Sequence, residues 1–204
     1  MKRLKLLLAD DHDIVIEGLR RVLDHPDFEI VGIVGDGRSL LRAAQDTRPD
    51  IIITDVTMPL LNGIEAVRQI RKNNRTVRIV FLTMHPDVTF ATEALAMGAS
   101  GYVLKNSAGE ELVAAIREAM KGRVYVAKSI AEAVKHAASS RAKSWRSPLE
   151  KLTSRQREVL QLLAEGLHVK EIATRLHVSP RTIEFHKYRI MDELGLRTGA
   201  ELAR

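Results

Sequence analysis

Short apolar runs alternate with longer amphipathic segments along the first 121 residues of the chain. The runs are rich in Leu, Ile and Val and are bounded by turn-forming residues, which favours strands buried on both faces of a parallel sheet. They cover residues 4–9, 28–34, 51–54, 77–83 and 101–104. The segments between them have apolar positions three and four residues apart, which predicts helices. These cover residues 13–24, 38–47, 64–73, 87–97 and 109–121.

Five strands alternating with five helices predict an α/β protein. Each helix crosses from one strand to the next with a right-handed connection, which gives a doubly wound five-stranded parallel sheet with helices on both faces. The last helix stops before Gly122, and glycine suits the left-handed conformation that often ends helices. We therefore assign residues 1–122 to one domain.

The regular pattern weakens between residues 123 and 149. Ser129 can cap a short amphipathic turn through residue 138, but the stretch that follows is polar and basic and contains Pro148. We interpret residues 123–149 as a linker, because this composition is typical of connecting segments. We expect Trp145 to dock on the surface of a domain.

Residues 150–204 are predicted to form a second, smaller all-α domain. Its helices cover about residues 153–166, 169–176 and 180–194. Thr153 and Gln156 have the spacing of a capping box, and Ser179 is suited to cap the helix that begins at Pro180. Two helices separated by a three-residue turn predict a helix-turn-helix.

Charge is distributed unevenly between the two halves. Residues 1–120 contain 15 Lys and Arg against 17 Asp and Glu, a net charge of −2, whereas residues 121–204 contain 17 against 9, a net charge of +8. The basic half suits a polyanion, although a solvated charged face is the simpler alternative. No apolar run approaches the roughly 18 residues of a membrane span. Asp10 comes too early for a signal peptide and the chain has no Cys, so we expect a cytoplasmic protein without a membrane partner.

Polar residues stand at the ends of four of the predicted strands. Asp10 and Asp11 follow the first strand, and Asp55, Thr83 and Lys105 stand at the ends of the third, fourth and fifth. Parallel strands end at the same edge of a sheet, so these side chains should converge on one crevice. Burying Asp55 without a partner is costly, so we expect a cation opposite it. Three neighbouring carboxylates need a divalent cation to neutralise them, and an all-oxygen site suits Mg²⁺.

With a metal present, one carboxylate can act as a nucleophile towards a phosphoryl group. We interpret Asp55 as this nucleophile because its strand is the most buried, with Asp10 and Asp11 holding the metal. Lys105 would pair with one phosphoryl oxygen and Thr83 would hydrogen-bond another. Each residue taken alone fits a strand-end salt bridge or cap, and it is the set of five that favours phosphoryl chemistry.

These residues lie in motifs that resemble the receiver domain of two-component response regulators, which has a flavodoxin-like fold. The motifs are ADDH at 9–12, TDVTMPLLNG at 54–63, FLTMH at 81–85 and GYVLK at 101–105. The resemblance implies that Asp55 accepts phosphate from a sensor histidine kinase. It also implies a Mg²⁺ ion bound by Asp10, Asp11, Asp55 and the carbonyl of Thr57.

The resemblance assigns two further roles. Tyr102 matches the aromatic switch that packs inward when Thr83 moves, and the alternative is an ordinary edge aromatic. Thr57 and His85 match positions that tune dephosphorylation in the family.

The third helix of the basic half has two faces. Its inward positions are Ile183, Ile190 and Leu194, and its outward positions are Arg181, Glu184, Phe185, Lys187 and Tyr188. An outward face that mixes cations with aromatics suits the major groove of double-stranded DNA, where cations contact the backbone and a few side chains read bases. A buried scaffold contact is the alternative for Phe185.

Residues 150–202 resemble the LuxR-type DNA-binding domain, and the whole chain resembles the NarL/FixJ class of response regulators. The motifs are LTSRQREVLQLLAEGL, KEIATRL, SPRTIEFH and LGLRTGAEL. The resemblance implies that Glu184, Phe185 and Tyr188 face bases. It places a second set near phosphates: Lys170, Ser179, Arg181, Thr182, His186, Lys187 and Arg189. Many members have Lys where this chain has Glu184, and a carboxylate there suits cytosine.

We therefore expect a phosphorylation-switched transcription regulator, not an enzyme, that forms a homodimer when phosphorylated. The resemblance implies a further carboxyl-terminal helix for dimerisation, expected to be short or cut because the sequence ends at Arg204. One alternative is a Mg²⁺-dependent phosphatase, although such enzymes usually carry a second acid where this chain has Thr57. Another is a constitutive DNA-binding protein whose receiver serves only for dimerisation.

Overall fold

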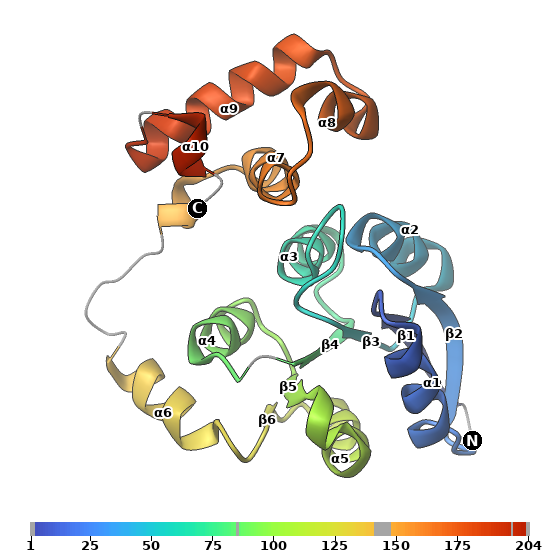
Figure 1. The fold of residues 1–204 in the computed structure, drawn as a ribbon. Helices are drawn as coiled ribbons and strands as arrows, with labels where there is room; N and C mark the ends of the chain where they lie inside the picture. The colour runs from blue at the N-terminus through green and yellow to red at the C-terminus, as the bar shows by residue number, and fades with distance from the viewer. Residues whose placement is uncertain (1–2, 85, 141–147, 197, 203–204) are drawn as a thin grey trace. The chain divides into compact units, whose positions relative to one another are not determined.

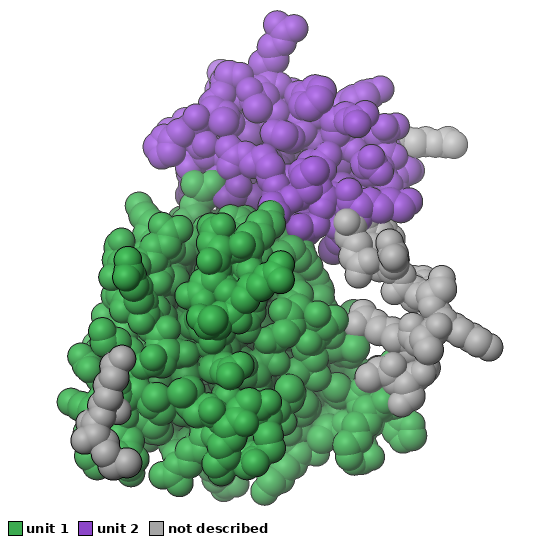
Figure 2. Space-filling view, turned by 180° about the vertical axis from the view of Figure 1, so that it is seen from behind, with its two compact units in different colours: residues 1–143 green, residues 144–204 purple. Residues whose placement is uncertain are grey.

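The computed structural model describes residues 3–84, 86–140, 148–196 and 198–202. The chain divides into two compact units, residues 1–143 and 144–204, which are coloured separately in Figure 2. Among the described residues, no helix is both long enough and apolar enough to cross a membrane.

The first unit is built on a parallel sheet with strand order β2-β1-β3-β4-β5-β6. The strands are β1 (Leu4–Ala9), β2 (Phe28–Val34), β3 (Ile51–Thr54), β4 (Arg78–Thr83), β5 (Gly101–Leu104) and β6 (Tyr125–Val126). The helices between them are α1 (Asp13–Val22), α2 (Gly37–Thr47), α3 (Gly63–Asn73), α4 (Val88–Ala96) and α5 (Ala108–Met120). The expected α/β doubly wound fold is confirmed (Figure 1).

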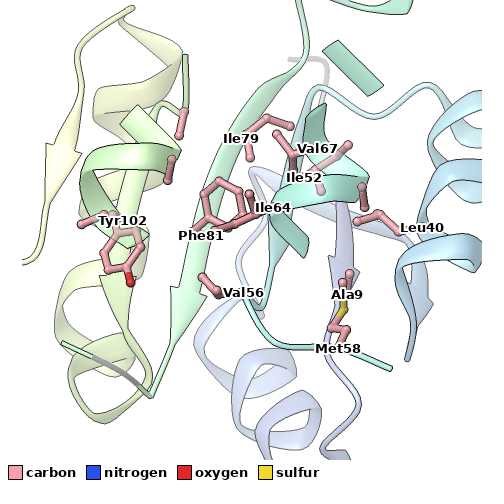
Figure 3. Packing of buried hydrophobic residues seen from close by; sticks show 14 of the residues in the cluster. Ala9, Leu40, Ile52, Val56, Met58, Ile64, Val67, Ile79, Phe81 and Tyr102 are labelled. Atoms are coloured by element: carbon pink, nitrogen blue, oxygen red, sulfur yellow. The ribbon is translucent and has the colours of Figure 1, made fainter. Parts of the chain in front are cut away.

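Two hydrophobic clusters lie on the two faces of this sheet. Apolar residues of α1 and α5 pack on one face, and those of α2, α3 and α4 pack on the other. Figure 3 shows the second cluster, in which Ile52 of β3 and Phe81 of β4 meet Val67 of α3. All four residues of β3 are buried, as its run of Ile predicts for a central strand.

The strands are in register at their carboxyl ends. Ala9 of β1 pairs with Thr54 of β3, and Thr83 of β4 pairs with Leu104 of β5. The residues that follow these positions therefore leave the sheet at one edge. This register positions the candidate site.

The predicted sheet of five strands is wrong by one strand, because β6 pairs with β5. β6 is only two residues long, which is too short to show a periodic pattern. The sequence predicts a linker over residues 123–149, but this stretch contains β6 and then α6 (Ala131–Ser140), which packs against α4 (Figure 1). Trp145 lies outside the described residues.

Burial of α6 makes it part of the first unit. Val134 of α6, and Ala127 and Ile130 just before the helix, are at most 5% exposed and belong to the same core cluster as Tyr102. We expect Val134→Ala to lower the free energy of unfolding of this unit by about 1–2 kcal/mol, because two buried methyl groups are lost. Urea unfolding measures the change, and Lys135→Ala on the exposed face of α6 is the control. Equal effects of the two substitutions would show that α6 is not packed in solution.

The second unit is a small helical bundle. Its helices are η2 (Pro148–Lys151), α7 (Ser154–Ala164), α8 (Val169–Leu176), α9 (Pro180–Leu194) and α10 (Gly199–Leu202). The Thr153–Gln156 capping box starts α7, and the Ser179 side chain accepts a hydrogen bond from the Thr182 backbone N–H at the start of α9. Val159, Ile172 and Ile183 are fully buried between the three main helices. The helix-turn-helix is formed by α8 and α9.

Candidate functional site

Three strand ends bring two acids and one cation into contact. The Lys105 Nζ atom lies 2.7 Å from Asp10 Oδ2 and 2.7 Å from Asp55 Oδ2. Asp10 and Asp55 are each only 4% exposed. Lys105, which follows β5, is therefore the cation expected opposite Asp55, and it bridges the two acids that follow β1 and β3.

Asp11 and His12 complete an acidic cluster at this edge. Single ligand atoms from Asp10, Asp11, His12 and Asp55 all lie within 4.8 Å of one another. The carboxylate oxygens are the ligands that a hard divalent cation such as Mg²⁺ prefers, so the donor set fits that ion. Lys105 offsets only part of the negative charge of three acids, which leaves a net attraction for a cation.

His12 is a member of this cluster that the sequence reasoning missed. Its Nδ1 atom lies 3.1 Å from Asp10 Oδ1 and 3.0 Å from Asp11 Oδ1, and its backbone N–H donates a hydrogen bond to Asp10 Oδ1. The only available signal was its place next to the two acids in the sequence. His12 thus helps to orient both carboxylates.

Burial and pairing act in opposite directions on the central pair. Burial raises the pKa of Asp55, and the hydrogen bond from Lys105 opposes this rise. Burial alone would lower the pKa of Lys105, but hydrogen bonds to Asp10 and Asp55 raise it overall. Lys105 therefore stays protonated, and its charge is available to an anion at this edge.

The loop after Asp55 is fixed by close backbone packing. A Cβ atom on Gly63 would lie 1.8 Å from the carbonyl oxygen of Asp55, and one on Gly37 would lie 2.0 Å from that of Leu61. Leu60 has a φ of 67°, which is unusual for a residue with a branched side chain. The Thr57 backbone N–H donates a hydrogen bond to the Asp55 carboxylate. These contacts hold Asp55 in one position. Of this loop structure, the sequence indicated only the turn-forming Asn-Gly at the start of α3.

Thr83 and Tyr102 form a second, buried pair next to the cluster. Both residues are fully buried, and their side chains are hydrogen-bonded to each other. Burial chiefly raises the pKa of Tyr102, and the charges of Asp87 and Asp55 add to the rise. Tyr102 is buried in the core of the receiver (Figure 3). Thr57 is exposed, and His85 lies outside the described residues.

Helix α9 carries an exposed stripe in the second unit. Arg181, Glu184, Phe185 and Tyr188 are all exposed, the two aromatics by 61% and 71%. Ile183 and Ile190 on the opposite side are fully buried. The alternative of a buried scaffold contact for Phe185 is therefore wrong.

The residues expected near phosphates differ from one another in exposure. Lys170, Arg181 and Arg189 are exposed, whereas Thr182, His186 and Lys187 are half-buried. The Ser179 hydroxyl caps α9 and lies 2.8 Å from the Thr182 hydroxyl. Burial, with a smaller effect of Arg155, lowers the pKa of His186.

Comparison with known proteins identifies both units. The family described as "Response regulator receiver domain" matches residues 6–117, and the family "Bacterial regulatory proteins, luxR family" matches residues 150–204. Response regulator GacA of Pseudomonas aeruginosa is 32% identical over 98% of this chain and 94% of its own length. The oxygen regulatory protein NreC of Staphylococcus epidermidis is 34% identical over 98% of this chain and 94% of its own length.

Solved structures agree with these relatives. RcsB of Salmonella typhimurium has a TM-score of 0.62 and 28% identity, covering 100% of this chain and 97% of that one. A two-component response regulator of the LuxR family from Aurantimonas sp. SI85-9A1 has a TM-score of 0.63 and 38% identity, covering 70% of this chain and all of that one. The chain belongs to the two-component response regulators that join a receiver domain to a LuxR-type DNA-binding domain and regulate transcription in response to phosphorylation.

Proposed function

We propose that Asp55 accepts a phosphoryl group from a sensor histidine kinase and thereby changes the affinity of the chain for double-stranded DNA. The observation that carries this proposal is the ion pairing of Lys105 with both Asp10 and Asp55 at the carboxyl edge of the sheet. In the transfer, the bond between phosphorus and a kinase histidine nitrogen breaks, and a bond forms to an Asp55 carboxylate oxygen.

The surrounding residues have separate roles in this step. Asp10, Asp11, Asp55 and the carbonyl of Thr57 would hold Mg²⁺, which neutralises charge on the phosphoryl oxygens when it is bound. Lys105 exchanges its contact with Asp55 for one with a phosphoryl oxygen. The exposed Thr57 stands where an aspartyl-phosphatase would carry a second acid, which supports a regulator over an enzyme.

Thr83 and Tyr102 would report the phosphoryl group to the rest of the receiver. The Thr83 hydroxyl turns towards a phosphoryl oxygen, and this requires a change in its hydrogen bond with Tyr102. Tyr102 stands beside α4, because it shares a core cluster with Ala91 and Ala94 of that helix. The pair thus couples the site to a helix that can move.

The second unit would bind the major groove with α9. Glu184, Phe185 and Tyr188 face bases, and Lys170, Ser179, Arg181, Thr182, His186, Lys187 and Arg189 lie near phosphates. Support comes from the exposed stripe of α9 and from RcsB, which is described in a complex with DNA and as dimers on DNA. We propose that phosphorylation favours a homodimer of this chain as well.

The test is to locate the phosphoryl group. The full chain is incubated with Mg²⁺ and a small phosphodonor, and peptide mass spectrometry identifies the modified residue. The proposal predicts Mg²⁺-dependent modification of Asp55. Modification of another residue, or none, would contradict it.

Salt dependence tests the DNA-binding half separately. Each phosphate contact contributes roughly −0.9 to the slope of log affinity against log salt for duplex DNA. We expect Arg181→Ala to weaken binding to all sequences alike and to reduce that slope by about 1. Fluorescence anisotropy at several salt concentrations measures both, with Arg117→Ala on α5 as the control. An unchanged slope would place Arg181 away from the phosphates.

A further inference from the structure

A pocket that the proposed function does not use lies at the amino edge of the receiver sheet, the opposite edge from Asp55. It is formed where the end of α1, the loop before β2, the start of β2 and the residue before β1 meet (Figure 1). Its volume is about 400 Å³. Pockets that hold small molecules have volumes of roughly 300–1,000 Å³, so this one is large enough for a small organic ligand.

Basic side chains predominate around this pocket. Its lining includes Arg3, Arg20, Arg21, Asp24 and His25. The three guanidinium groups and the one carboxylate give a net charge of +2, whereas residues 1–120 as a whole carry a net charge of −2. A positive pocket on an acidic domain indicates a site that attracts an anion.

Two of the arginines stand at the end of α1 without capping it. Carbonyl oxygens of the last helical turn accept hydrogen bonds from the backbone N–H groups that follow the helix. Within the described residues the Arg21 guanidinium makes no hydrogen bond or ion pair, and Arg20 makes only a loose one, with its Nε atom 3.7 Å from Glu17 Oε1. The helix dipole favours cations at this place, but it leaves the donor groups of Arg21 available to a ligand.

Arg3 brings the third guanidinium from a different element. It precedes β1, so the dipole of α1 does not account for its position. One of its terminal amino groups donates a hydrogen bond to the Phe28 carbonyl oxygen, which holds the side chain beside the pocket. A guanidinium group donates two parallel hydrogen bonds, a geometry that matches phosphate oxygens. The pocket thus collects phosphate-binding groups from two separate segments of the chain.

Apolar side chains complete the lining. Leu23 and Phe28 are only 2% and 3% exposed, and Ile30 is half-buried. The His25 ring is tilted against the Phe28 ring, with 5.5 Å between their centroids. A bare inorganic anion would leave this apolar surface uncovered, whereas the body of an organic ligand would cover it.

We propose that this pocket binds a phosphate group carried by a small organic molecule. Arg3, Arg20 and Arg21 hold the phosphate, and the apolar side chains contact the organic part. A dianionic phosphate balances the net charge of +2, which a single carboxylate does not. The site is separate from phosphoryl transfer at Asp55 and from DNA binding by α9, so it stands or falls independently of both.

Titration calorimetry of the full chain tests the site, with adenosine monophosphate as the probe. The probe should bind, inorganic phosphate should bind more weakly, and uncharged adenosine should not bind. Arg21→Gln should weaken binding of the probe by roughly 10-fold or more, because charge-assisted hydrogen bonds are lost. Arg117→Gln is the matched control, because it removes the same charge from an exposed position of α5 outside the pocket. Absence of binding by the wild-type chain, or equal weakening by both substitutions, would overturn the proposal.

Backbone amide NMR signals locate the bound probe. Signals of residues 20–28 should shift when adenosine monophosphate is added to the wild-type chain, and should stay in place in Arg21→Gln. Shifts confined to residues 150–202 would put the probe in the DNA-binding unit and overturn the proposal.

Duplex DNA is the other source of phosphate groups, and its binding is measured with the same variants. Arg21→Gln should leave the affinity for DNA unchanged. Weaker DNA binding by Arg21→Gln, together with no binding of adenosine monophosphate by the wild-type chain, would assign the arginines to the DNA backbone instead of a small ligand.

Discussion

Asp55→Asn should abolish incorporation of a phosphoryl group into the chain. Asn has nearly the same shape as Asp, but its amide is not a nucleophile and does not pair with Lys105 as a carboxylate does. The measurement is label incorporated from a small phosphodonor in the presence of Mg²⁺, and we expect it to fall to background. The loss should be complete because Asp55 supplies the atom that forms the new bond.

A control variant with the same change of charge separates loss of the nucleophile from a general effect of removing a carboxylate. Asp46→Asn changes an exposed residue of α2 and should leave incorporation at the wild-type level. Thermal unfolding of both variants checks that the fold is retained. Persistent labelling of a folded Asp55→Asn chain would move the nucleophile to another residue.

Gly63→Ala should have the largest effect on stability among the single methyl additions considered. The new Cβ atom would lie 1.8 Å from the Asp55 carbonyl oxygen and 3.0 Å from the Thr54 Oγ1 atom, so the start of α3 or the end of β3 must shift. We expect the free energy of unfolding of the receiver to fall by about 3 kcal/mol or more, at the upper end of the cost of overpacking. Phosphoryl incorporation should also slow, because the shift displaces Asp55.

Gly109→Ala adds the same methyl group but should have the opposite effect on stability. A Cβ atom on Gly109 meets nothing within 4 Å, and the residue is already helical in α5. Its substitution should raise stability by up to about 1 kcal/mol, because alanine loses less backbone entropy on folding. Urea unfolding of both variants measures the difference. Similar stabilities would contradict the close packing of Gly63 against Asp55.

The sequence predicted the sheet well where burial dictated its pattern. Four of the five predicted strands have the observed bounds. The remaining one, β4, begins one residue later than predicted, at Arg78. β6 and α6 were harder to identify, because β6 is only half-buried and Val134 is the one buried side chain among those described in α6. A strand of two residues has too few positions for a periodic signal.

The acids and the lysine of the candidate site were predictable from the sequence, whereas His12 and the contacts within the site were not. Spacing and strand ends placed Asp10, Asp55 and Lys105 at one edge, because parallel strands must end together. The contact between Gly63 and the Asp55 carbonyl depends on how a loop folds back over the sheet, which residue types alone do not specify. The same holds for the Thr83–Tyr102 hydrogen bond, since it requires the rotamer of a buried ring.

DNA affinity with and without phosphorylation tests most directly whether the receiver site controls the DNA-binding domain. A duplex DNA is first selected from a random pool by the full chain. Its binding by the full chain is then measured in Mg²⁺ with and without a small phosphodonor, and in parallel for Asp55→Asn. The wild-type affinity should change by about 5- to 150-fold, a typical coupling between two sites, and the affinity of Asp55→Asn should stay constant. Equal wild-type affinities in the two conditions, with Asp55 shown to be modified, would contradict the account.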